Sequence, residues 1–245
     1  MTGRLEGRVA LVTGGAGGIG GASVLALLDE GCRVVATGIS DEEIAPWLDD
    51  DRYQGVDWRV LDVGDLAAVD QLARNISELD ILVNCAGIVV RGEAAFEEDA
   101  FMRVVDINLT GTMRCCRAFL PHLQKRPGTI VNIASMMSFF GSGTSPGYAA
   151  SKGGVAQLTK SLAITWAKYG IRVNAIAPGW IETPMVREAV MKNDMALYDR
   201  VAQRTPMGRW GEPHHIGRVV PLLCDDGAGW VTGVILPVDG GYSVV

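Results

Sequence analysis

Tyr148 and Lys152 stand four residues apart in the stretch YAASK, with only small side chains between them. The surrounding sequence, from about Pro146 to Tyr169, is typical of a helix, and residues i and i+4 lie on one helix face. A phenol beside an ammonium is either an ordinary packing pair or a phenol prepared for proton transfer. A nearby cation favours the phenolate and lowers the phenol pKa from its usual ~10.

A glycine-rich stretch, TGGAGGIG at 13–20, lies between an apolar segment and a segment with helical spacing. Gly14, Gly18 and Gly20 allow the backbone to turn tightly and to approach a ligand closely. The helix that follows directs its free N–H groups and the positive end of its dipole at the turn. We expect a dinucleotide pyrophosphate there, and the alternative is a tight turn without a ligand.

Strand-like and helix-like segments alternate along the chain. Continuous apolar strands between helices indicate a parallel sheet that is covered on both faces. We therefore predict an α/β fold, a single doubly wound Rossmann-type domain over residues 1–245 with a seven-stranded parallel sheet flanked by helices. Strands are expected at 8–14, 33–38, 57–62, 79–84, 129–135, 171–178 and 233–241, and helices at 18–30, 99–124 and 146–169.

Ser135 stands at the end of the fifth expected strand, and the loop after it leads into the helix with Tyr148. In doubly wound sheets, ligands bind beyond the carboxyl ends of the strands. We therefore expect the hydroxyl, the phenol and the ammonium to converge there. The expected base is not a histidine, because the chain has only three.

The composition restricts the possible partners. The net charge is −6 and no basic run is present, so nucleic acid and anionic membranes are poor partners. No apolar run approaches the ~18 residues of a membrane span. The five cysteines are scattered without a CxxC pattern, which favours a reducing cytoplasm over a disulfide framework or zinc site. We expect no bound metal.

Taken in order, the motifs resemble those of the short-chain dehydrogenase/reductase family. The resemblance runs from about residue 5 to the C-terminus. It implies an NAD(P)-dependent oxidoreductase that transfers a hydride between a nicotinamide cofactor and a secondary alcohol or ketone, and it implies a homotetramer. The stretches that carry it are TGGAGGIG at 13–20, LDV at 61–63, NCAG at 84–87, DINLTG at 106–111, Ser135, YAASK at 148–152, RVNAIAPG at 172–179 with Thr183, and PVDGG at 237–241.

The resemblance also implies roles for individual residues. Tyr148 is the expected acid/base, Lys152 tunes its pKa and contacts the nicotinamide ribose, and Ser135 holds the substrate oxygen. Asn108 is expected to hold a water that links Lys152 to solvent. The residues expected to bind the cofactor are Gly14, Gly18, Ile19, Gly20, Gly38, Asp62, Val63, Asn84, Ala86, Gly87, Tyr148, Lys152, Pro178, Gly179, Ile181 and Thr183.

The choice between NAD and NADP is expected to depend on charge after the second strand. Gly38 occupies the position where NAD-dependent relatives often have Asp, so the usual NAD marker is absent. Ile39 and Ser40 are neutral, and the acidic run 41–43 follows. A 2′-phosphate would meet carboxylates and no cation, so we expect NAD, with NADP possible. On this view, Gly38→Asp should sharpen the preference for NAD.

The substrate is less well defined. The loops expected to cover it are apolar, and no cluster of arginines is seen that would bind a phosphate or carboxylate. We expect a small secondary alcohol or ketone, including sugar-derived or cyclic polyols. A 3-oxoacyl-thioester reductase is an alternative, and a non-catalytic dinucleotide sensor or scaffold is another that the intact Ser135, Tyr148 and Lys152 oppose. The expected covering residues are Met136, Met137, Phe139, Phe140, Trp180, Met185 and Val186.

Overall fold

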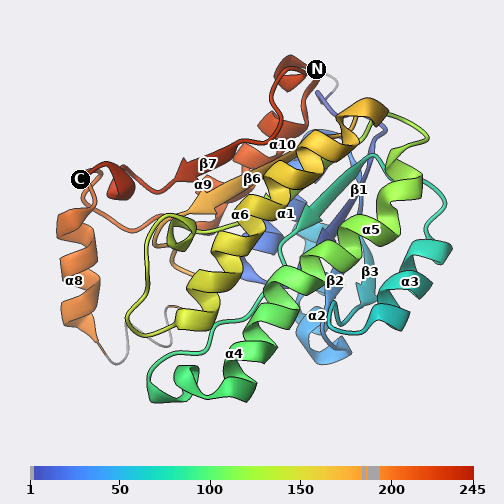
Figure 1. Ribbon diagram of the computed structural model, residues 1–245. Helices are drawn as coiled ribbons and strands as arrows, with labels where there is room; N and C mark the ends of the chain where they lie inside the picture. Colours follow the sequence, from blue (N-terminus) through green and yellow to red (C-terminus); the bar gives the residue numbers. More distant parts are fainter. Residues whose placement is uncertain (1–2, 184–185, 187–193) are drawn as a thin grey trace.

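Seven parallel strands form one sheet in the computed structural model, which describes residues 3–183, 186 and 194–245 (Figure 1). The strand order is β3-β2-β1-β4-β5-β6-β7, and every neighbouring pair is parallel. The predicted doubly wound α/β fold is therefore confirmed. The strands are β1 (Val9–Thr13), β2 (Arg33–Gly38), β3 (Asp57–Val60), β4 (Ile81–Asn84), β5 (Thr129–Ile133), β6 (Arg172–Pro178) and β7 (Ile235–Val238).

Helices cover both faces of this sheet, because successive strand residues point to opposite sides. In β1, Ala10 and Val12 join the core formed with α1, α9 and α10, whereas Val9 and Leu11 join the core formed with α3, α5 and α6. In Figure 1, α5 and α6 lie in front of the sheet. The helices are α1 (Gly18–Asp29), α2 (Asp41–Leu48), α3 (Leu66–Asn75), α4 (Glu98–Val105), α5 (Gly111–Leu123), α6 (Pro146–Trp166), α8 (Met195–Arg204), α9 (Pro213–Gly217) and α10 (Val219–Cys224).

The strand order reverses between β1 and β4, and this point positions the site. The carboxyl ends of the two strands lie side by side, with Thr13 paired to Asn84. The Thr13 hydroxyl accepts hydrogen bonds from the backbone N–H groups of Cys85 at 3.2 Å and Ala86 at 3.3 Å. A crevice opens at such a reversal, and it is where doubly wound sheets bind ligands.

The expected helix at 99–124 differs from the structure in one respect. Between α4 and α5 the chain forms a π-helical turn, Asp106–Thr110, in place of regular α-helix. Such a turn weakens the regular hydrogen-bond ladder and is frequent at functional sites. Here the fully buried Asn108 makes side-chain hydrogen bonds across the fold that compensate. Helices α2, α3, α8, α9 and α10 were not among the sequence expectations.

None of the helices in the described residues is long and apolar enough to cross a membrane. All five cysteines are free thiols, and four of them are buried. The two adjacent thiols, Cys115 and Cys116, lie inside α5 and pack in the core, as expected for small apolar side chains.

Candidate active site

One cavity of about 1150 Å³ runs along the carboxyl ends of the strands. It exceeds the ~300–1,000 Å³ that a single small ligand usually occupies. Its walls come from the glycine-rich loop, the end of β2, the loops after β3, β4, β5 and β6, and α8. All the predicted site residues line it except Asn84 and Asn108.

The glycine-rich loop forms a cradle with backbone on its surface. Gly14 has a φ of +64°, and a Cβ there would lie 2.8 Å from the backbone of Ala86. A Cβ at Gly20 would lie 2.0 Å from the carbonyl oxygen of Gly14. The N-cap of α1 is Gly17, which provides no side-chain cap. The first N–H groups of α1 therefore have no side-chain acceptor, and they fit the pyrophosphate of a dinucleotide.

Ser135 follows β5 and caps a single 3₁₀ turn, Met136–Ser138. Its hydroxyl accepts a hydrogen bond from the N–H of Met137 at 3.1 Å. Within the same turn, the Ser138 hydroxyl donates to the carbonyl oxygen of Lys152 at 2.7 Å. The loop after β5 is thereby attached to α6, which fixes Ser135 relative to the helix that carries the tyrosine.

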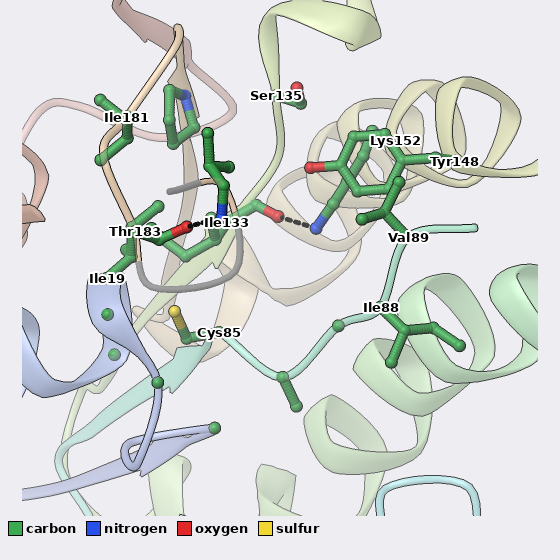
Figure 2. A pocket seen from close by; sticks show the side chains of 18 of the residues that line it. Ile19, Cys85, Ile88, Val89, Ile133, Ser135, Tyr148, Lys152, Ile181 and Thr183 are labelled. Atoms are coloured by element: carbon green, nitrogen blue, oxygen red, sulfur yellow. Dashed lines mark hydrogen bonds between the residues drawn. The ribbon is translucent and has the colours of Figure 1, made fainter. Parts of the chain in front are cut away.

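Tyr148 and Lys152 lie on one face of α6, as their spacing predicts. The Lys152 ammonium donates to the carbonyl oxygen of Ile133 at 2.6 Å and lies 5.7 Å from the centre of the Tyr148 ring. Figure 2 shows the Tyr148 oxygen directed into the cavity, with Ser135 and Lys152 on the same side and Ile19, Thr183 and Ile181 across from them. The structure thus brings the three groups together at the mouth of the cradle.

Asn108 does not line the cavity but holds its wall. Its side-chain oxygen accepts from the N–H of Ile88 at 2.8 Å, and its NH₂ group donates to the Ile88 carbonyl at 2.9 Å and to Ser151 at 3.1 Å. Ser151 in turn donates to the Tyr148 carbonyl at 2.8 Å. We expected Asn108 to hold a water. In the structure both polar atoms of its side chain already form hydrogen bonds with protein groups.

Burial dominates the electrostatics of the site. It raises the pKa of the Tyr148 phenol, while hydrogen bonding with Ser135 and the charge of Arg91 act in the opposite direction. Burial also lowers the pKa of Lys152 to about 8. We expected Lys152 to lower the pKa of Tyr148 outright. The shift of the Tyr148 pKa is instead upward, because burial disfavours the charged phenolate more than its neighbours favour it.

Asn84, which we expected to line the cofactor, does not line the cavity. Its NH₂ group points into the sheet, where it donates to the Asn132 side chain at 2.8 Å and to the Cys116 sulfur at 3.2 Å. Asn132 continues this buried network to Thr159 at 2.9 Å. A buried amide requires partners, and these partners turn Asn84 away from the cavity.

The residues expected to cover the substrate divide into two groups. Met136, Met137, Trp180 and Val186 line the cavity, whereas Phe139 and Phe140 do not. Phe139 is 49% exposed. Met185 lies outside the described residues. The Trp180 ring packs 5.1 Å from that of Trp210, which stacks on Tyr198 at the same distance.

Sequence reasoning missed several charged residues in the cavity wall. Three arginines contribute to it: Arg91 after β4, Arg103 on α4 and Arg200 on α8. The sequence analysis named none of these three arginines as cavity-lining residues. Because these arginines come from three segments that are distant in the sequence, no local sequence pattern predicts that they line one cavity. Glu43, from the first turn of α2, was also not expected as a lining residue.

Comparisons with known proteins agree on one class. Residues 14–243 match a family model described as enoyl-(acyl carrier protein) reductase. The chain is 39% identical over 247 residues to cis-4-hydroxycyclohexanecarboxylate dehydrogenase of Sinomonas cyclohexanicum, covering 97% of both chains. It is 37% identical to 3-oxoacyl-[acyl-carrier-protein] reductase FabG of Thermotoga maritima, over 98% of this chain and 100% of that one.

A solved structure from Agrobacterium tumefaciens is similar throughout. It is a putative 2-deoxy-D-gluconate 3-dehydrogenase with bound NADP, with a TM-score of 0.89 and 39% identity, and 98% of both chains is covered. The strand and helix arrangement described above is thus shared over nearly the whole chain with a protein that holds a dinucleotide.

Replacing Tyr148 by Phe tests its part in proton transfer. The ring is kept and only the ionisable oxygen is lost, so we expect dinucleotide binding to survive and turnover of an alcohol or ketone to fall by ~10² or more. Calorimetric titration and initial rates measure the two quantities. Tyr169→Phe, at an exposed position in the 3₁₀ turn that follows α6, is the control. Turnover within a few-fold of wild type in Tyr148→Phe would remove this residue from the role.

The pKa of Lys152 predicts how stability depends on pH. The folded-state pKa is about 8, below the ~10.4 of an unfolded chain. Between these values the unfolded state binds more protons, so the free energy of unfolding contributed by Lys152 rises with pH, by up to about 1.4 kcal/mol per pH unit. We expect urea unfolding of wild type, measured relative to Lys152→Met, to show this rise from pH 8 to 10. A flat difference would contradict the lowered pKa.

Proposed function

The chain belongs to the short-chain dehydrogenase/reductase family of NAD(P)-dependent oxidoreductases, and we propose that it oxidises a secondary alcohol that bears an anionic group, or reduces the corresponding ketone, with Tyr148 as acid/base. The observation that carries this proposal is the convergence of Ser135, Tyr148 and Lys152 on a cavity that continues into the glycine-rich cradle. A module that only senses a dinucleotide has no need for that trio.

Two side chains of this protein act on the substrate: one transfers its proton and the other positions its oxygen. A nicotinamide bound in the cavity supplies the hydride acceptor or donor. In oxidation, the Tyr148 oxygen takes the proton of the substrate hydroxyl, and in reduction it returns a proton to the carbonyl oxygen. The Ser135 hydroxyl donates a hydrogen bond to that oxygen and keeps it close to the phenol.

Lys152 supports the phenolate that forms during this transfer. With a pKa of about 8 it carries its charge at neutral pH, and its ammonium lies beside the Tyr148 ring. The nearby cation offsets part of the cost of burying the phenolate. Asn108 acts by position, because it joins the loop at Ile88 to the helix turn beneath Tyr148.

Arg91 supports an anionic substrate. Both ends of its loop are fixed, Ile88 by Asn108 and Gly92 by a backbone hydrogen bond to Thr144 at 3.0 Å. Its charge acts on Tyr148. Within the described ranges it has no ion pair or hydrogen-bond partner of its own. A cation in the cavity wall whose charge acts on the reacting phenol favours a carboxylate on the substrate. The names of two relatives, a hydroxycyclohexanecarboxylate and a deoxygluconate dehydrogenase, agree with this.

A panel of paired substrates tests the function and the substrate class together. Each pair consists of a hydroxy acid, such as 4-hydroxycyclohexanecarboxylate or a sugar acid, and its neutral amide, and a 3-oxoacyl thioester is included. With both dinucleotides, absorbance of the nicotinamide band reports turnover. We expect turnover of the acids with kcat/KM about tenfold or more above that of the amides, because charge-assisted hydrogen bonds are the stronger ones.

The controls separate the possible outcomes. Arg91→Gln should abolish the difference between acid and amide, whereas Arg59→Gln, which removes an exposed cation paired to Asp57 outside the cavity, should preserve it. Equal rates for acids and amides would contradict the recognition of an anionic group but not the oxidoreductase activity. Preferred use of the thioester with NADPH would favour the reductase alternative, and dinucleotide binding without turnover of any substrate would favour a sensor.

The proposal extends to the domain organisation, the preferred cofactor and the cellular compartment of the enzyme. Residues 1–245 act as one dinucleotide-binding and catalytic domain. NAD is the preferred cofactor, on the charge argument above, although the similar structure from Agrobacterium tumefaciens holds NADP. The five free thiols support the reducing cytoplasm as its compartment.

The assembly proposed is a homotetramer. Large apolar side chains are exposed on the outer side of α6 and near the C-terminus, with Ile164 81%, Trp230 100% and Val244 81% exposed. Strand β7 is an edge of the sheet, and exposed edges and apolar patches favour burial against another chain. Light scattering at micromolar concentration should give the mass of four chains. Ile164→Asp should lower that mass, Leu66→Asp on α3 should not, and a wild-type monomer would contradict the assembly.

A further inference from the structure

The end of β2 is already occupied by a side chain from another element. A Cβ at Gly38 would lie 3.0 Å from a carboxylate oxygen of Glu43, 2.8 Å from the side chain of Ile44 and 3.1 Å from that of Ala16. The space that an acidic side chain at position 38 would use is therefore filled, and one of the atoms that fills it is itself a carboxylate oxygen.

Glu43 is held in this position by the start of α2. Its carboxylate accepts a hydrogen bond from the N–H of Ile39 at 2.7 Å. Ser40 is the N-cap of the helix, and its hydroxyl accepts from the N–H of Glu43 at 3.4 Å. The first turn of α2 thus folds the Glu43 side chain back onto the end of β2, and Gly38, Ile39 and Glu43 line the cavity together.

This arrangement has two effects on a nucleotide ribose at the end of β2. A carboxylate oxygen accepts hydrogen bonds from ribose hydroxyls and repels a phosphate. The Glu43 carboxylate also occupies the backbone N–H of Ile39, so this donor is not available to a 2′-phosphate. Neither the glycine-rich loop 13–20 nor the segment 38–43 contains a lysine or arginine that would offset the repulsion.

We propose that Glu43, reaching back from the first turn of α2, reads the adenosine ribose in place of the acidic residue that β2 lacks and makes the cavity selective for NAD over NADP. This inference rests on the proposed function, because it requires a bound dinucleotide. It also reverses the expectation for Gly38→Asp. That substitution has no room beside Glu43 and Ile44, so it should weaken binding of both dinucleotides instead of sharpening the preference.

Binding of NAD⁺ and NADP⁺ to the full chain, measured by titration calorimetry, tests the inference without a known substrate. We expect wild type to bind NAD⁺ about tenfold or more tightly than NADP⁺, and Glu43→Gln to reduce this ratio about tenfold, mainly by tightening NADP⁺. Glu42→Gln is the matched control, because Glu42 belongs to the same turn but does not line the cavity. Its ratio should remain that of wild type.

Salt dependence distinguishes charge from shape. Added salt screens charges near the surface, so the wild-type ratio should fall with ionic strength while that of Glu43→Gln changes little. A wild-type preference for NADP⁺, or an unchanged ratio in Glu43→Gln, would overturn the role of Glu43 and leave the oxidoreductase function intact. Failure of wild type to bind either dinucleotide would overturn the proposed function, and this inference with it.

Discussion

The side-chain amide of Asn108 is the contact on which the geometry of the site depends. It is fully buried at a π-helical turn, and its two polar atoms join segments far apart in the sequence, the loop at Ile88 and the helix position of Ser151. Loss of a buried amide that satisfies several partners leaves each of them without a hydrogen bond. One residue thus sets the position of the Arg91 loop relative to the helix that carries Tyr148.

Close helix packing supports this contact. A Cβ at Gly154 of α6 would lie 2.6 Å from the side chain of Leu109, and one at Gly147 would lie 3.2 Å from the Cα of Phe101. Glycines at these positions allow α6 to approach α4 and the π-helical turn closely enough for Ser151 to reach Asn108. The same approach buries Lys152 to 5% exposure. The fold therefore places a cation where burial opposes its charge, which is typical of catalytic sites.

The sequence allowed the sheet and about half of the residues in the cavity wall to be predicted, for identifiable reasons. Strand β2 was predicted at its observed bounds, because the short apolar run 34–36 is followed by Thr37 and a glycine there. The residues that converge on the cavity follow strand ends, and parallel topology brings such ends together. The direction of the Asn84 side chain depends on Asn132 and Cys116, and the role of Glu43 depends on how one helix turn folds back. Neither follows from local pattern, because both are set by contacts between separate elements.

The indole rings in the wall of the cavity have a consequence for observing the protein. Trp47 belongs to α2 and packs 4.9 Å from the ring of Tyr53, whereas Trp180 follows β6 and packs against Trp210. Both indoles line the same cavity but belong to different walls. Tryptophan emission responds to the polarity around the ring. The fluorescence of each indole therefore responds to changes in the part of the cavity that it lines. Of the six tryptophans in the chain, two therefore line the binding site, one in each half of it.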